Sequence, residues 1–120
     1  MDDLLYREII LEHWQNPQNY GVLANAEIDI VEFNPLCGDE IRIMVKIKNK
    51  KIERISFVST GCAISRASAS LFIEMVKGKQ IKHIKRMKPN DFLKTLEIEI
   101  SPSRLKCALL AYSTLQKALR

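Results

Sequence analysis

The sequence predicts an α+β fold in which a small antiparallel, three-stranded sheet packs against helices, with one helix at each end of the chain. Three observations lead to this prediction. Apolar residues alternate with polar ones over residues 41–47 and again over residues 52–58, as in half-buried strands. Near both termini the apolar residues recur at the three-four spacing of amphipathic helices. A run of small side chains in helical register follows Gly61.

In the first third of the chain, the sequence predicts a helix, a turn and a strand. The helix is expected over residues 2–15, and its apolar face consists of Tyr6, Ile9, Ile10, His13 and Trp14. It ends at Asn16-Pro17, because the residue before a proline avoids helical backbone angles. A turn-rich segment through Asn19-Tyr20-Gly21 then leads to a first strand over residues 27–33.

The two clearest strands form a predicted antiparallel hairpin. The first runs from Ile41 to Ile47, with Arg42 and Lys46 on the face opposite the isoleucines. The polar residues 48–51 turn the chain into a second strand, Ile52 to Val58.

The second half of the chain predicts mainly helices. A small-residue helix from Cys62 stops at Gly78, and a short helix over Gln80–Met87 is ended by Pro89. Asn90 or Asp91 is expected to cap another brief turn, and residues 96–100 alternate like a strand.

The last helix is expected to begin at Ser101-Pro102, with Cys107 off the centre of its apolar stripe. That stripe comprises Leu105, Ala108, Leu109, Tyr112, Leu115 and Leu119. No linker or repeat interrupts the pattern, so residues 1–120 are expected to form a single domain.

Composition narrows the class of protein. The chain has 120 residues, 47% of them hydrophobic and 28% charged, with no long apolar stretch and no signal-like amino terminus. We therefore expect a cytoplasmic protein with no membrane partner. The net charge of +5 does not indicate a nucleic-acid partner, because acidic residues are interspersed and no nucleic-acid motif occurs. The basic run from Lys77 to Lys88 is expected to be a solvated face.

The three cysteines are the main functional signal. Cys37 lies in a Pro/Gly-marked loop with Asp39 two residues later, Cys62 follows Gly61 at a predicted helix start, and Cys107 lies in the first turns of the last helix. An odd number of widely spaced cysteines does not fit a disulfide framework. Thiolates and carboxylates bind zinc or iron, and a helix amino terminus favours the thiolate. Each cysteine taken alone could equally be a small buried apolar residue.

Three ordered motifs resemble those of the IscU/NifU/SufU family of iron–sulfur scaffolds. They are Asn34-Pro35-Leu36-Cys37-Gly38-Asp39, the run Gly61-Cys62-Ala63-Ile64-Ser65-Arg66-Ala67-Ser68-Ala69-Ser70, and Lys106-Cys107-Ala108. Asn16-Pro17-Gln18-Asn19-Tyr20-Gly21 also resembles that family's Asn-Pro-x-Asn-x-Gly segment. The resemblance covers nearly the whole chain.

The resemblance implies an α+β scaffold that accepts sulfur from a cysteine desulfurase, assembles a [2Fe–2S] cluster and transfers it to recipient apo iron–sulfur proteins. It implies no enzymatic turnover beyond sulfur transfer. By motif, Cys37, Asp39, Cys62 and Cys107 would be the cluster or metal ligands, with Asp39 the labile one. Cys37 and Cys107 are both candidates for the first persulfide acceptor. The prediction requires that folding gathers these four side chains into one pocket.

This chain departs from the pattern of each branch of the family. IscU-like proteins carry a histidine immediately before the third cysteine, whereas this chain has Lys106, so it resembles the SufU branch more at this position. A SufU-like role would be zinc-dependent sulfur transfer that activates the desulfurase, with Zn²⁺ on the same four residues, yet this chain shows no SufU-like insertion after the second motif. Residues 101–106 do not match the IscU chaperone-binding segment, so a dedicated chaperone is not expected.

Other readings are weaker. A small adaptor with a structural zinc site would need close ligand pairs such as Cys-x-x-Cys, and a cysteine hydrolase would need an oriented histidine base. His13 is expected to be a packing or hydrogen-bonding residue, and His83 a surface residue. The Ala/Ser run over residues 63–70 fits either close helix packing or hydrogen bonding to cluster sulfides.

Overall fold

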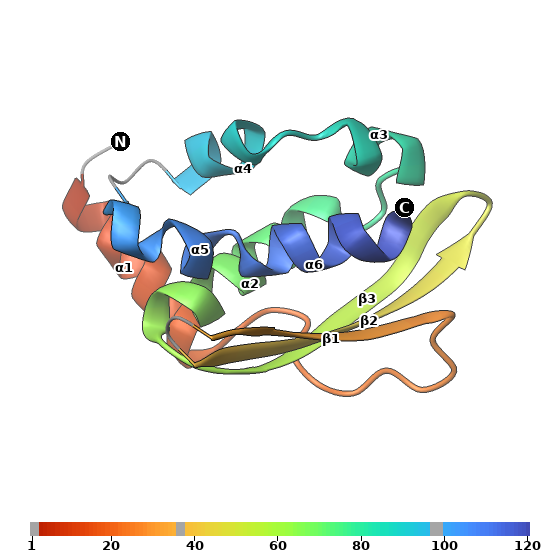
Figure 1. Cartoon of the computed structure of the whole chain (residues 1–120), viewed down its shortest axis with the longest axis horizontal. Helices are drawn as coiled ribbons and strands as arrows, with labels where there is room; N and C mark the ends of the chain where they lie inside the picture. The colour runs from red at the N-terminus through yellow and green to blue at the C-terminus, as the bar shows by residue number, and fades with distance from the viewer. Residues whose placement is uncertain (1–2, 36–37, 97–99) are drawn as a thin grey trace.

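A computed structural model describes residues 3–35, 38–96 and 100–120 of the chain (Figure 1). Its elements, in chain order, are α1 (Asp3–Gln15), β1 (Ile28–Asn34), β2 (Asp39–Lys48), β3 (Lys51–Thr60), α2 (Ala63–Val76), α3 (Ile81–Arg86), α4 (Pro89–Leu96), the 3₁₀ turn η1 (Pro102–Arg104), α5 (Leu105–Ala108) and α6 (Leu110–Leu119). The predicted α+β fold with an antiparallel three-stranded sheet is confirmed. No helix within the described ranges is both long and apolar enough to cross a membrane.

The sheet has the order β1-β2-β3, and both strand pairs are antiparallel. The predicted hairpin is correct, with Lys48 opposite Lys51 across a two-residue turn. Both turn residues, Asn49 and Lys50, have positive φ (54° and 61°), as a two-residue hairpin turn of type I′ requires. The pairing of β2 with β3 places Glu40 opposite Thr60 at the end of the hairpin away from the turn. Asp39, the first residue of β2, therefore lies next to the end of β3.

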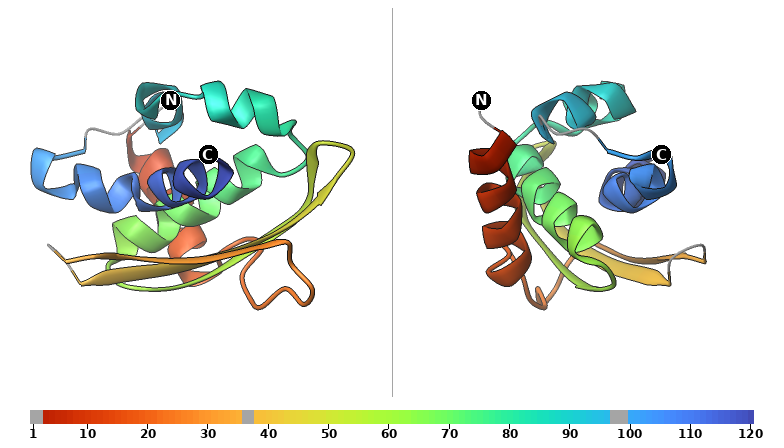
Figure 2. Two further views of the ribbon diagram at one scale, coloured as in Figure 1. Left: turned by 45° about the vertical axis from the view of Figure 1, so that its right-hand side comes forward. Right: turned by 90° about the vertical axis from the view of Figure 1, so that its left-hand side faces the viewer.

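The helices cover one face of the sheet in two layers (Figures 1 and 2). The side chains of Ile41, Ile43 and Val45 in β2 are fully buried between the sheet and the helices. In Figure 2, α1 lies beside α2, while α3 and α4 lie on the side of α2 and α6 that faces away from the sheet. An edge-to-face ring contact of Phe72 in α2 with Phe92 in α4 joins the two helix layers, and a similar contact of Phe72 with Tyr112 joins α2 to α6.

Two irregular segments protect the open edge of β3. Residues 19–21 pair with Phe57 through two backbone hydrogen bonds, and residues 78–81 pair with the start of β3 in the same way. An edge strand with unpaired backbone groups invites aggregation, so these segments cover part of the β3 edge. The loop before β1 also crosses the outer face, where the Leu23 N–H contacts the sulfur of buried Met44.

The structure corrects two expectations. The last helix is not continuous, because η1, α5 and α6 are separate segments with a break at Leu109, whose backbone angles are φ −99° and ψ 2°. The strand expected over residues 96–100 is wrong at its start, since Leu96 is the buried last residue of α4. Residues 97–99 lie outside the described residues.

A third expectation is refined rather than overturned. Of the two residues proposed to cap the helix after Pro89, Asp91 is the one that acts, since its carboxylate accepts the Lys88 N–H at 2.8 Å. Pro89 itself begins α4 instead of merely ending the preceding helix.

Candidate metal centre

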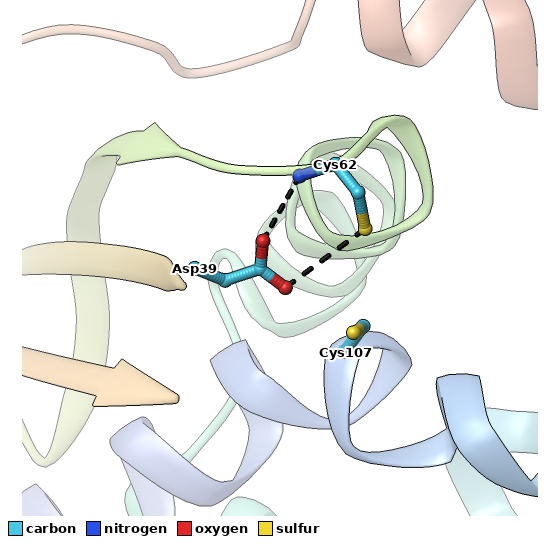
Figure 3. Close-up of side chains that lie close together, drawn as sticks. All are labelled: Asp39, Cys62 and Cys107. Atoms are coloured by element: carbon cyan, nitrogen blue, oxygen red, sulfur yellow. Dashed lines mark hydrogen bonds between the residues drawn. The ribbon is translucent and has the colours of Figure 1, made fainter. Parts of the chain in front are cut away.

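Three of the four predicted donors come together at one end of the sheet. Asp39 begins β2, Cys62 immediately precedes α2, and Cys107 lies in α5. Their ligand atoms, one carboxylate oxygen and two sulfurs, all lie within 4.8 Å of one another (Figure 3). Cys37, the fourth predicted donor, lies outside the described residues. Its part in the site therefore stays a prediction.

Cys62 is positioned by the start of helix α2. It is the N-cap residue, with extended backbone angles, and its sulfur accepts the Ser65 N–H at 3.4 Å. A capping side chain satisfies one of the amides that have no partner in the first helical turn. The amino terminus of a 14-residue helix also favours negative charge, and its first turn contains no acidic residue. The Cys62 sulfur is therefore held in a fixed position at the start of α2, where a metal ligand can point toward Asp39 and Cys107.

Asp39 is fixed by the same segment. Its side chain is fully buried, and one carboxylate oxygen accepts the backbone N–H of Cys62 at 2.9 Å. The other oxygen lies 3.8 Å from the Cys62 sulfur. A buried carboxylate requires such partners, because an unsolvated and unpaired charge would cost several kcal/mol. The backbone of Cys62 therefore orients Asp39 toward the two sulfurs.

Gly61 makes this arrangement possible. It has φ +145°, a region that residues with side chains rarely adopt. A β-carbon at this position would lie 2.0 Å from Oδ1 of Asp39. The absence of a side chain at residue 61 thus allows the carboxylate to reach the Cys62 amide.

Cys107 approaches from the opposite side, on the one-turn helix α5 (Figure 3). Only 2% of its surface is exposed, whereas Cys62 is partly exposed. The off-centre position expected for Cys107 in the apolar stripe does not leave it exposed. The break at Leu109 separates α5 from α6, so Cys107 and the buried face of α6 need not follow one helical period.

The donor set fits a tetrahedral metal. Around zinc, bond lengths of about 2.3 Å to sulfur and 2.0–2.2 Å to oxygen place neighbouring ligand atoms roughly 3.6–3.8 Å apart. The separation of Asp39 Oδ2 and the Cys62 sulfur, 3.8 Å, already matches. Since no pair exceeds 4.8 Å, closing the set around a metal takes a movement of about 1 Å. Two soft sulfurs and one hard oxygen suit zinc or iron.

Neither histidine belongs to this site. His13 Nδ1 lies 2.7 Å from the hydroxyl of Ser70 in α2, which also accepts the Gln18 N–H at 2.8 Å. Burial lowers the pKa of His13 below its usual 6.5, against the raising effects of Glu74 and Glu12. This hydrogen bond agrees with the packing role expected of His13, and His83 is exposed, as expected. Ser70 serves the contact between α1 and α2, which favours the packing interpretation at that residue of the Ala/Ser run.

Sequence reasoning missed two features around the site. One is the role of Gly61, which depends on a residue 22 positions earlier and therefore has no local signal. The other is the contact of Arg66 with Tyr20, in which the guanidinium carbon lies 4.7 Å from the ring centre. The Tyr20 hydroxyl donates to the carbonyl of Ser59, two residues before Gly61. Lys106 and Arg104, by contrast, are exposed.

Comparison with known proteins identifies relatives along nearly the whole chain. Residues 5–120 match the family model described as the NifU-like N terminal domain. The chain is 36% identical to the zinc-dependent sulfurtransferase SufU of Bacillus subtilis, covering 98% of this chain and 90% of that protein. It is 35% identical to the iron–sulfur cluster assembly enzyme IscU of Drosophila melanogaster, covering 96% and 76% respectively.

A solved structure gives the same result. FiSufU of Fervidobacterium islandicum AW-1, a proposed iron–sulfur cluster assembly scaffold protein for the SUF system, superposes with a TM-score of 0.79 at 27% identity, with full coverage of both chains. The alignment with the Bacillus protein extends over 134 residues, more than the 120 of this chain, so that relative contains residues with no counterpart here.

Proposed function

The chain belongs to the NifU-like N-terminal domain family, and on this basis we propose that it is an iron–sulfur cluster assembly scaffold. In this role it accepts sulfur from a cysteine desulfurase, assembles a [2Fe–2S] cluster on its cysteines and transfers the cluster to apoproteins. Residues 1–120 act as one cytoplasmic domain that carries cargo without catalytic turnover of its own. The relatives whose names describe iron–sulfur cluster assembly support this general role.

One observation carries the proposal at the level of this chain. Asp39, Cys62 and Cys107 come from three separate elements, yet their donor atoms lie within 4.8 Å of one another. The set combines the buried carboxylate of Asp39 with one buried and one partly exposed sulfur, which are donor types that bind zinc and iron. Holding a metal or a cluster would use all three, and Cys37 would complete the four donors.

The donors would have different tasks. Cys62 is held in place by the α2 amino terminus, so it serves as the fixed thiolate. Asp39 is a hard oxygen donor whose bond to soft iron is the most exchangeable of the set. A scaffold must retain its cluster during assembly and release it afterwards. The carboxylate supplies the weak bond, and its hydrogen bond to the Cys62 amide returns it to position after release.

Sulfur acceptance requires an exposed thiolate. In the transfer, the thiolate attacks the outer sulfur of the desulfurase persulfide, forms a new S–S bond and expels the desulfurase cysteine as a thiolate. Cys107 is only 2% exposed, so it can act first only if α5 moves outward. Cys37 is the alternative acceptor, and both assignments follow from the family motifs.

A second function has its own support. A zinc-dependent sulfur carrier that stimulates the desulfurase would use the same four residues with Zn²⁺ as the resident metal. Zinc bound there would hold the thiolates in the reactive, deprotonated form. Lys106 in place of a histidine and the 36% identity to a zinc-dependent sulfurtransferase favour it. The Bacillus protein contains residues that have no counterpart in this chain, and this difference favours the scaffold function.

Anaerobic reconstitution separates the two functions. The purified protein is incubated with iron, cysteine and a cysteine desulfurase, and its visible spectrum, metal content and effect on desulfurase rate are recorded. Asp39→Ala is compared with Asp29→Ala, which removes a surface carboxylate paired with Arg42 and leaves the site intact.

The outcomes are distinct. Cluster absorption whose lifetime changes in Asp39→Ala and not in Asp29→Ala supports the scaffold. Stoichiometric zinc with desulfurase stimulation and no cluster supports the sulfur carrier. Tight zinc that raises stability without affecting either reaction would leave only a structural zinc adaptor and would refute both proposals.

A further inference from the structure

A pocket lies at the end of the molecule away from the metal centre. It has a volume of about 530 Å³ and is formed where the β2–β3 turn meets the start of α3. Its lining residues are Ile47, Asn49, Lys50, Gln80, Ile81, Lys82 and Lys85. In Figure 1 this turn is at the right-hand end of the molecule, whereas α5 and the beginning of α2 are at the left.

The rim of this pocket is strongly basic. Lys50, Lys82 and Lys85 are exposed, and of the described residues that line the pocket none is acidic. The ion pairs found in the described part of the chain are Arg42–Asp29 and Lys117–Glu32, so the three rim lysines have no acidic partner there. The carboxylate of Glu27 accepts the Ile47 N–H, and in the described part of the chain it forms no ion pair with a rim lysine. Clustered cations without counter-charges repel one another and attract an anionic partner.

Lysine is an unfavourable residue for the backbone conformation at position 50. It is the second residue of the hairpin turn and has φ 61°, where glycine carries no steric penalty and Asn-Gly is the preferred pair. Retaining a lysine there weakens the turn and adds a cation to the pocket. Such local strain is typical of functional positions.

The pocket is also rigid. The carbonyl of Lys50 accepts the Ile81 N–H at 2.9 Å, and Ile52 exchanges hydrogen bonds with Gly78 and Lys79. These bonds join the hairpin to the segment leading into α3. The backbone positions from which the lysines project are therefore set before any partner arrives, so binding need not order the two segments.

We propose that this pocket binds an acidic peptide segment that carries an aliphatic side chain, supplied by a partner protein. Partly buried Ile47 and Ile81 offer an apolar contact, the Asn49 and Gln80 amides can pair with a peptide backbone, and the lysines pair with carboxylates. A nucleic acid fits less well, since none of the described lining residues is an aromatic side chain on which bases stack. A partner held here would leave the metal centre uncovered.

The test uses the full chain and a defined probe, the fluorescein-labelled peptide acetyl-Glu-Glu-Leu-Leu-Glu-Glu-amide, followed by fluorescence anisotropy at low salt. Two comparison ligands are the same peptide with serine in place of leucine and an oligothymidylate carrying four phosphates. The variants are Lys50→Gly and Lys82→Gln, and the matched control is Lys94→Gln, which removes an exposed lysine of α4 outside the pocket.

Loss of one rim lysine should weaken peptide binding about two- to fivefold, the effect of one exposed ion pair. Lys94→Gln should bind as the wild type does, and the serine peptide should bind more weakly than the leucine peptide. Lys50→Gly should also raise the melting temperature, because it removes the backbone strain. Metal binding at the distant site should be unchanged in all three variants, so this result is independent of the proposed scaffold function.

The inference is overturned by any of four results. These are no binding of the leucine peptide to the wild type at millimolar concentration, equal affinity of the wild type and Lys50→Gly, equal affinity for the leucine and serine peptides, or tighter binding of the oligothymidylate than of the peptide. A lower melting temperature of Lys50→Gly would show that the lysine is retained for stability, and this also contradicts the argument.

Discussion

Replacing Gly61 with alanine should disrupt the metal centre through a single added methyl group. The new β-carbon would lie 2.0 Å from Asp39 Oδ1, and ordinary contacts begin at 3.4 Å, so the carboxylate must retreat by more than 1 Å. The 2.9 Å hydrogen bond from the Cys62 N–H then breaks, at a cost of about 1.5–3 kcal/mol for a bond to a charged group. Backbone strain at φ +145° adds about 1–3 kcal/mol.

Gly21→Ala is the matched control. Gly21 has a similar φ of +132°, but a β-carbon there meets nothing within 4 Å. It should therefore lose only the strain energy, about 1–3 kcal/mol. Urea unfolding of the metal-free proteins measures both changes. Gly61→Ala should be less stable than Gly21→Ala by about 1.5–3 kcal/mol, the value of the lost hydrogen bond.

Metal affinity gives a second measurement. Titration with Co²⁺, followed by its absorption in the visible range, should show at least about tenfold weaker binding in Gly61→Ala, because a displaced donor costs on the order of 1.4 kcal/mol or more. Gly21→Ala should bind as the wild type does. Equal stability losses in the two variants, together with equal Co²⁺ affinities, would show that Asp39 does not depend on the space at residue 61.

Three further changes test the surrounding fold. Ser70→Ala removes a buried hydroxyl that accepts the Gln18 N–H and contacts His13, so it should lower the free energy of unfolding by about 1–3 kcal/mol in urea titrations. The lowered pKa of His13 means that the unfolded chain takes up a proton first, so stability present above pH 6.5 should decrease as the pH falls below it. Thermal unfolding should show a weaker pH dependence over this range in His13→Gln. Tyr112→Phe removes the hydrogen bond to the Met87 carbonyl and should cost about 0.5–1.5 kcal/mol by the same urea assay, with no change in metal binding.

The sequence predicts well those elements whose hydrophobic period matches their burial. Ile41, Ile43 and Val45 alternate along the chain and are buried on one face of β2, so the hairpin and its orientation followed directly. At residue 96 two periods overlap. Leu96 lies four residues after Phe92, as in a helix, and also begins an alternating run toward Ile100. The helical contacts prevail, since Phe92 and Leu96 are both fully buried.

The candidate site was predictable by residue type and not by geometry. Cys62 at a helix start was expected from Gly61 and the small residues after it, and its place at the α2 N-cap agrees with that reading. The helix break at Leu109 was not expected, because the apolar stripe continues through that residue. The orientation of Asp39 toward the sulfurs depends on contacts between distant segments, which periodicity does not report. The ligand roles themselves stay predictions.

The assembly of the centre from β2, α2 and α5 has a consequence for protein lifetime. An ion bound by Asp39, Cys62 and Cys107 would act as a reversible cross-link between segments that are otherwise joined only through long stretches of chain. Because the ion binds the folded site and is released on unfolding, it stabilises the folded state. Occupied molecules would then unfold and be digested by proteases more slowly than empty ones, so the cell would selectively clear the copies that carry nothing.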